Sequence, residues 1–123
     1  MKMKLLLLSI LTLSICGLQA QDDLAQSTIQ GVLQGNQEQV IQLAEAFSEE
    51  QYDWRPSEGV SSVGEALLHV ATANYFLASK MGFPPPADVD MMGLSKITGK
   101  DNIIAAVKKS NAFVLEKVIF LHG

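Results

Sequence analysis

The chain has 123 residues, 48% of them hydrophobic, and its nine basic and 13 acidic residues give a net charge of −4. This length suits a single domain with one apolar core. An acidic chain without a clustered basic patch argues against nucleic-acid binding, because neutralising phosphates supplies most of that affinity. A single cysteine excludes an internal disulfide.

Residues 1–20 are expected to form a secretory signal peptide rather than part of the fold. Two lysines precede a mainly apolar run at 5–13, and small residues precede a polar segment. About 14 apolar-leaning residues fall short of the roughly 20 that a membrane-spanning helix needs. Cys16 leaves a lipoprotein as an alternative, although Ile15 stands where a lipobox requires a small residue. We therefore expect cleavage after Ala20 and a periplasmic or secreted protein.

Cleavage would leave residues 21–123 as one mature domain. It removes two lysines and the only cysteine, so seven basic residues face all 13 acidic ones, a net charge of −6. The mature protein is then expected to have no attraction to an anionic membrane. It also has no thiolate to attack a substrate or to bind a metal.

The first predicted helix runs from about Asp22 to Phe47, where apolar residues recur at helical spacing among Glu and Gln. Gly35 weakens its middle, since glycine costs about 1 kcal/mol relative to alanine inside a helix. A bend or break near Gly35 is therefore an alternative to a continuous helix. Beyond it, Ser48 and Gln51 predict one short capped helical turn.

The polar segment 48–61 has a Trp-Arg-Pro triplet at its centre. Trp54 is expected either to plug the end of a helical bundle or to act with Arg55 as a binding anchor. Arg55 is expected to pair with Asp53 or Glu58. The residues alone leave both the structural and the binding interpretation open.

The second helix has a clear beginning and end. Ser62 and Glu65 fit a capping box, in which the hydroxyl accepts from the Glu65 amide and the carboxylate reaches back. We expect the helix to continue to Lys80 or Met81 and to stop at Gly82, because the prolines that follow cannot extend it.

The connection from Gly82 to Lys100 has 19 residues, more than most loops in a compact domain. It is long enough to cross the bundle from end to end, which would make the helices on either side parallel. The alternative is a lid over a site. Both interpretations fit the sequence.

The third helix is predicted to begin near Asp101, which would cap it, and to run toward Leu121. Its apolar seam contains Asn111, as the stripe of the second helix contains Asn74. Because buried amides need hydrogen-bond partners, we expect these two side chains to bond across the helix interface.

His69 lies beside the apolar stripe of the second helix, next to Phe76. Two interpretations remain open: a partly buried imidazole bonded to a carbonyl or carboxylate, or a ligand of Zn, Ni or Fe. The only other histidine, His122, is about 13 Å too far along an antiparallel helix, and farther along a parallel one. The two histidines are therefore not a site within one chain. Glu65, one turn before His69, is a weaker candidate ligand because capping already explains it.

The segment 38–80 combines an amphipathic helix end, Asp53-Trp54-Arg55-Pro56, Gly59 and the Ser62-Val63-Gly64-Glu65 helix start. In this it resembles the DinB/YfiT-like superfamily of small helical metalloproteins, and residues 96–114 more weakly resemble the start of that family's third helix. The resemblance implies an all-α, DinB-like four-helix bundle, often a homodimer. It also implies a divalent metal, usually Zn or Ni, held by one histidine on the second helix and two on the fourth. His69 looks like the first of these ligands.

The sequence departs from that family in lacking the fourth helix and its H-x-x-x-H pair. We therefore expect an incomplete bundle of three main helices, a truncated copy preceded by a signal peptide. Characterised members include thiol-dependent S-transferases, but no catalytic residue can be named here. The leading hypothesis is an exported DinB-like metal-binding protein with His69 as a ligand. The alternatives are a non-catalytic envelope binding module using the Trp54-Arg55 loop, and a non-functional fragment whose apolar stripes drive self-association.

Overall fold

A computed structural model describes the backbone of residues 2–119 and the side chains of residues 24–117. The elements within this range are α1 (Lys2–Ala46), η1 (Glu49–Asp53), α2 (Val63–Lys80), η2 (Leu94–Lys96) and α3 (Lys100–Ile119), where η denotes a short 3-10 helix. All regular structure described is helical, which confirms the predicted all-α class and its three main helices. The side chains of the predicted signal peptide and of His122 lie outside the described residues.

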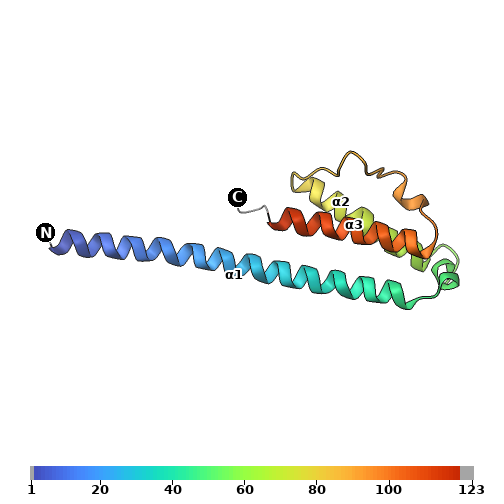
Figure 1. Cartoon of the computed structure of the whole chain (residues 1–123), viewed down its shortest axis with the longest axis horizontal. Coiled ribbons are helices and arrows are strands. Elements are labelled where there is room, and N and C mark those ends of the chain that lie inside the picture. The colour runs from blue at the N-terminus through green and yellow to red at the C-terminus, as the bar shows by residue number, and fades with distance from the viewer. Residues whose placement is uncertain (1, 120–123) are drawn as a thin grey trace.

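The three long helices lie side by side, with α2 and α3 running in the same direction and α1 running against them (Figure 1). Side-chain contacts fix this arrangement. Near the start of both helices, Gly64 on α2 lies opposite Ile103 on α3. Farther toward the C-terminal end of both helices, Asn74 on α2 bonds to Asn111 on α3. The connection between α2 and α3 therefore crosses the bundle from end to end, as one of the two predicted alternatives required.

Both ends of α2 lie where the sequence predicts them, because each is set by residues close together in the chain. The Ser62 hydroxyl accepts from the Glu65 amide at 3.2 Å, and the Glu65 carboxylate accepts from the Ser62 amide at 3.0 Å. At the other end Gly82 adopts a φ of 93°, and the amide of Phe83 donates to the Ala78 carbonyl at 3.0 Å. This is a Schellman cap, and it ends α2 where the sequence predicts.

The structure decides between the two alternatives for the first helix, and it shows that the predicted cap of the third helix was wrong. The helix α1 is continuous through Gly35, so the possible break there does not occur. Asp101 lies inside the first turn of α3 and does not precede it. The amide that opens α3, that of Lys100, donates instead to the Glu49 carboxylate at 3.1 Å. This carboxylate comes from η1, 51 residues earlier, and a negative charge at a helix N-terminus is favourable.

The core forms two connected clusters. The larger lies where the three helices meet near η1, and the smaller lies where the long connection returns along α2 and α3. The first contains Ala44, Tyr52, Leu67, Leu68, Ala71, Ile103, Ile104 and Val107, and the second contains Tyr75, Ala78, Leu94 and Phe113. Phe83, Val89, Met91 and Ile97 from the connection pack on the second cluster. The connection is thus part of the fold.

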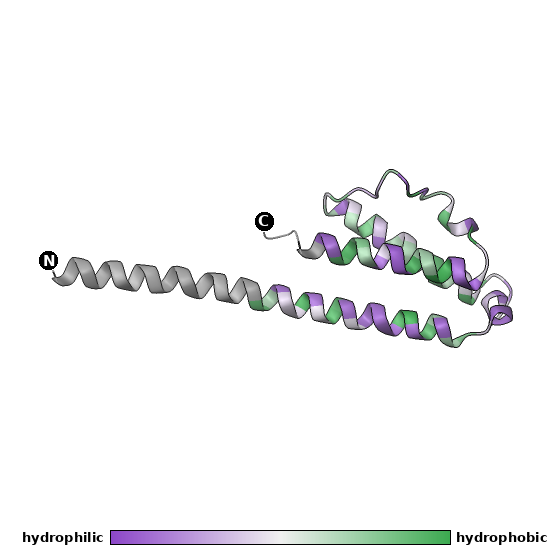
Figure 2. Cartoon of the chain, in the orientation of Figure 1, coloured by the Kyte–Doolittle hydropathy of each residue, from purple (hydrophilic) through white to green (hydrophobic). Residues whose placement is uncertain are grey.

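Both α1 and α2 pack against α3, but they make few contacts with each other. Their remaining sides carry exposed apolar residues, which we call the uncovered surface: Leu24, Ile29, Val32, Leu43, Phe76 and Leu77. Apolar segments are visible on all three helices, whereas the region around η1 is polar (Figure 2). Among the residues with described side chains, no helix is apolar over a length that would cross a membrane.

Candidate functional site

His69 is exposed on the side of α2 that faces away from the core, and it forms no hydrogen bond or ion pair within residues 24–117. Ala66 and Phe76, on the same side of the helix, are exposed as well. The interpretation of His69 as a partly buried, hydrogen-bonded imidazole is therefore wrong. An exposed imidazole remains available to an external group.

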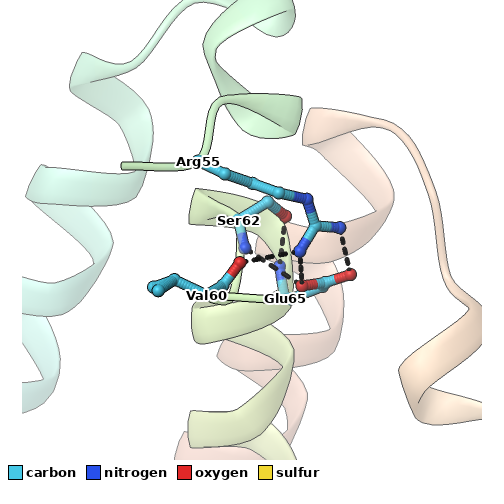
Figure 3. A network of polar contacts seen from close by, with 4 residues as sticks. All are labelled: Arg55, Val60, Ser62 and Glu65. Carbon is cyan, nitrogen blue, oxygen red and sulfur yellow. Dashed lines mark hydrogen bonds and ion pairs between the residues drawn. The ribbon is translucent and has the colours of Figure 1, made fainter. Parts of the chain in front are cut away.

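Glu65, one helical turn before His69, is fully engaged elsewhere. Arg55 donates to both of its carboxylate oxygens, at 2.6 and 2.7 Å, and Arg55 also donates to the carbonyl of Val60 at 2.9 Å (Figure 3). Parallel hydrogen bonds of this kind are the strongest form of arginine–carboxylate pair. Arg55 therefore pairs with Glu65, and the predicted partners Asp53 and Glu58 were wrong.

This network shifts the ionisation of both partners. The hydrogen bonds from Arg55 hold the pKa of Glu65 below its usual value, and the Ser62 amide adds to the effect. The Glu65 carboxylate in turn raises the pKa of Arg55. Glu65 is thus a charged cap that fixes the loop before α2, and the pairing leaves it poorly placed to join His69 as a ligand.

The two aromatic residues before α2, Tyr52 and Trp54, have different surroundings. Trp54 is 60% exposed and does not plug the bundle end. Tyr52 takes that position instead: it is buried, and its hydroxyl donates to the Ala44 carbonyl at 2.7 Å. The sequence gives Tyr52 a weak signal, since it falls at the end of the predicted short turn. Trp54 remains free to contact a partner.

A polar cluster crosses the interface between α2 and α3. The Asn74 side-chain amide donates to the Asn111 side-chain carbonyl at 2.8 Å and to the Ser110 hydroxyl at 3.0 Å. The predicted Asn74–Asn111 bond is confirmed. Gln37 on α1 joins the cluster by donating to the Asn111 backbone carbonyl at 3.3 Å. These bonds set the register of three helices against one another.

The described residues do not by themselves form a metal centre. Among residues 24–117, no three His, Cys, Asp or Glu side chains lie close enough together to hold an ion. Three or four donors are typical of a bound divalent transition metal. A divalent ion at His69 would therefore take further ligands from a second copy or from residues outside this range.

A cavity of about 650 Å³ lies beneath the long connection, where a lid over a site was one of the two predicted alternatives. Tyr75 of α2 lies in it, together with residues of α3 and of the segment 88–98. A second cavity, of about 250 Å³, lies beside the Arg55–Glu65 pair. Both depend on how the connection crosses the bundle, which periodicity alone does not show.

Comparison with known proteins gives one match. Residues 33–116 match the family model described as the DinB superfamily. The match includes residues 33–46 at the end of α1, all of α2 and most of α3. No curated protein and no solved structure matches the chain.

Proposed function

Since the chain belongs to the DinB superfamily, we propose that it is an exported DinB-like protein in which His69 supplies one ligand to a divalent metal. The exposure of His69 carries this proposal. An imidazole without a protein partner, on the uncovered side of a helix, is free to ligate. Imidazole suits several divalent transition metals, and the DinB resemblance favours Zn or Ni among them.

The uncovered surface offers a place from which the other ligands of the metal would come. The uncovered surface on α1 and α2 is apolar, as the lining of a helix–helix interface is, and its residue Phe76 lies two helical turns from His69 on the same side of α2. A further helix over this surface, from a second copy or from residues outside 24–117, would bring donors to His69. In this arrangement the three described helices are three members of a four-helix bundle.

Metal titration of the full chain tests the proposal. We expect Zn²⁺ or Ni²⁺ to bind, and His69→Ala to weaken binding at least about tenfold, because one imidazole is lost from the ligand set. Gln42→Ala removes an exposed polar side chain from α1 and should bind as the wild type does. Absence of bound metal, or equal affinity in the His69→Ala variant, would contradict the proposal. Sedimentation in the presence of metal shows whether a second copy supplies ligands.

A second candidate function is supported by the exposed Trp54. A non-catalytic binding module of the cell envelope would use this indole and the rigid Arg55 loop beside it as anchors. Trp54 is the only tryptophan of the chain, so its fluorescence reports directly on a partner at this loop. A binding partner that changes this fluorescence without metal would favour the second candidate.

A further inference from the structure

The cavity beneath the long connection lies apart from His69 and the uncovered surface. Its wall on α3 includes Ala105 and Ala106, and the connection adds Leu94 and Ile97. Its volume, about 650 Å³, falls within the range of about 300–1,000 Å³ that small-molecule sites occupy. A mainly apolar wall with a few polar groups is typical of such sites.

Tyr75 provides an unusual polar group in this cavity. It is 1% exposed, and its ring packs against Phe113 with centroids 5.3 Å apart. No described residue forms a hydrogen bond with its hydroxyl, whereas the hydroxyl of the other buried tyrosine, Tyr52, bonds to Ala44. A buried tyrosine hydroxyl normally has a partner.

The Tyr75 hydroxyl is also not sealed off. Among residues 24–117, the one fully enclosed side-chain polar atom without a partner is Oε1 of Gln37. Because Tyr75 lines the cavity, the small exposed part of its side chain faces into it. Its hydroxyl is therefore an unused hydrogen-bonding group presented to a cavity of ligand size.

Charges at the rim limit which ligands fit. Lys109 of α3 donates to Asp88 of the connection at 2.6 Å, so these two charges compensate each other. Asp90 also lines the cavity and adds a further negative charge. The lining is thus net negative, and an anion is disfavoured there.

We propose that this cavity binds a small uncharged amphipathic molecule. Its apolar body would lie against Leu94, Ile97 and Ala106, and a hydroxyl or amide head would bond to the Tyr75 hydroxyl. The apolar residues Phe83, Val89, Met91 and Ile97 pack the connection onto the core beside the cavity, and the Asp88–Lys109 pair joins the connection to α3 at its rim. The site is separate from any metal at His69 and is present in one chain.

Two matched probes test the site by NMR on the ¹⁵N-labelled full chain. Benzyl alcohol has the proposed chemistry, and benzoate replaces its head with an anion on the same ring. We expect benzyl alcohol to shift the amide signals of Leu94, Thr98 and Ala106 saturably, and benzoate to bind about threefold or more weakly. Absence of saturable shifts at these amides, shifts confined to the uncovered surface, or equal binding of benzoate would overturn the proposal.

Two variants locate the probe. Tyr75→Phe removes only the hydroxyl, which has no partner to lose, and should weaken benzyl alcohol binding about 2- to 10-fold while the protein stays folded. Ala105→Phe fills the cavity from an exposed position of α3 and should abolish binding. Ala112→Phe, at another exposed position of α3 that does not line this cavity, should have no effect. Unchanged binding in Ala105→Phe would overturn the proposal even if Tyr75→Phe behaved as expected.

Discussion

At the scale of single residues, Glu65 receives hydrogen bonds from two directions. Its carboxylate accepts from Arg55 and from the Ser62 amide, and both interactions favour the charged form. The pKa of Glu65 is therefore lower in the folded state than in the unfolded chain. The stabilisation from this pair is complete above the unfolded pKa and is lost as the pH falls through the folded pKa.

We predict that Arg55→Gln lowers the free energy of unfolding at neutral pH, and that the difference from wild type shrinks as the pH falls below about 4.5. Urea unfolding between pH 7 and pH 2.5 measures this difference. Lys96→Gln removes an exposed positive charge that has no ion pair within residues 24–117 and should show no such trend. A gap between Arg55→Gln and wild type that grows in acid would refute the prediction.

The sequence reveals some of these residue contacts and hides others for a physical reason. The Ser62–Glu65 cap is predictable because its atoms are three residues apart on one turn. Asn74 and Asn111 are predictable as partners because each interrupts an apolar stripe. The partner of Arg55 is not predictable in this way. Arg55 and Glu65 are ten residues apart, and they meet only because the loop between them turns at Gly59, which has a φ of 80°.

At the scale of whole elements, the glycines of α1 and α2 differ in their surroundings. A Cβ on Gly64 of α2 would lie 3.1 Å from Cδ1 of Ile103 and 3.3 Å from the Tyr52 carbonyl oxygen, both in the core. A Cβ on Gly31 of α1 would meet nothing within 4 Å. Glycine at position 64 thus permits close packing of α2, whereas glycine at position 31 only weakens a helix.

We predict opposite effects of the same substitution in the two helices. Gly31→Ala should stabilise the protein by about 0.5–1 kcal/mol through helix propensity. Gly64→Ala should destabilise it by about 1–3 kcal/mol because the added methyl overpacks a well-filled core. Thermal unfolding of both variants measures the two signs. Stabilisation by Gly64→Ala would show that Ile103 can move aside.

Element boundaries were predictable wherever their signals are local, and less so where a distant residue supplies the cap. Gly82 and the prolines after it predict the end of α2, and the structure ends the helix there. The beginning of α3 depends on the Glu49 carboxylate, which is 51 residues away from Lys100 in the sequence and so lies outside any local signal around Asp101. The direction of α3 relative to α2 remained open in the sequence because a 19-residue connection permits either.

At the scale of the whole molecule, the uncovered surface predicts self-association. Phe76 and Leu77 are 52% and 60% exposed on consecutive positions of α2, and contiguous apolar surface tends to be buried against another chain. We expect the sedimentation coefficient to rise with protein concentration, and Phe76→Ser with Leu77→Ser to reduce that rise. Met92→Ser, which removes an exposed side chain from the connection, should not. A compact monomer at all concentrations would contradict this expectation.

The parallel placement of α2 and α3 has a consequence for how the chain folds. Asn74 and Asn111 are 37 residues apart in sequence, and Gln37 and Asn111 are 74 apart. Because α1 and α2 make few contacts with each other, a hairpin of these two helices gains little as the chain leaves the ribosome. Closing such long loops costs entropy before any contact repays it. Folding is therefore expected to wait for the synthesis of α3 and then to occur in one cooperative step.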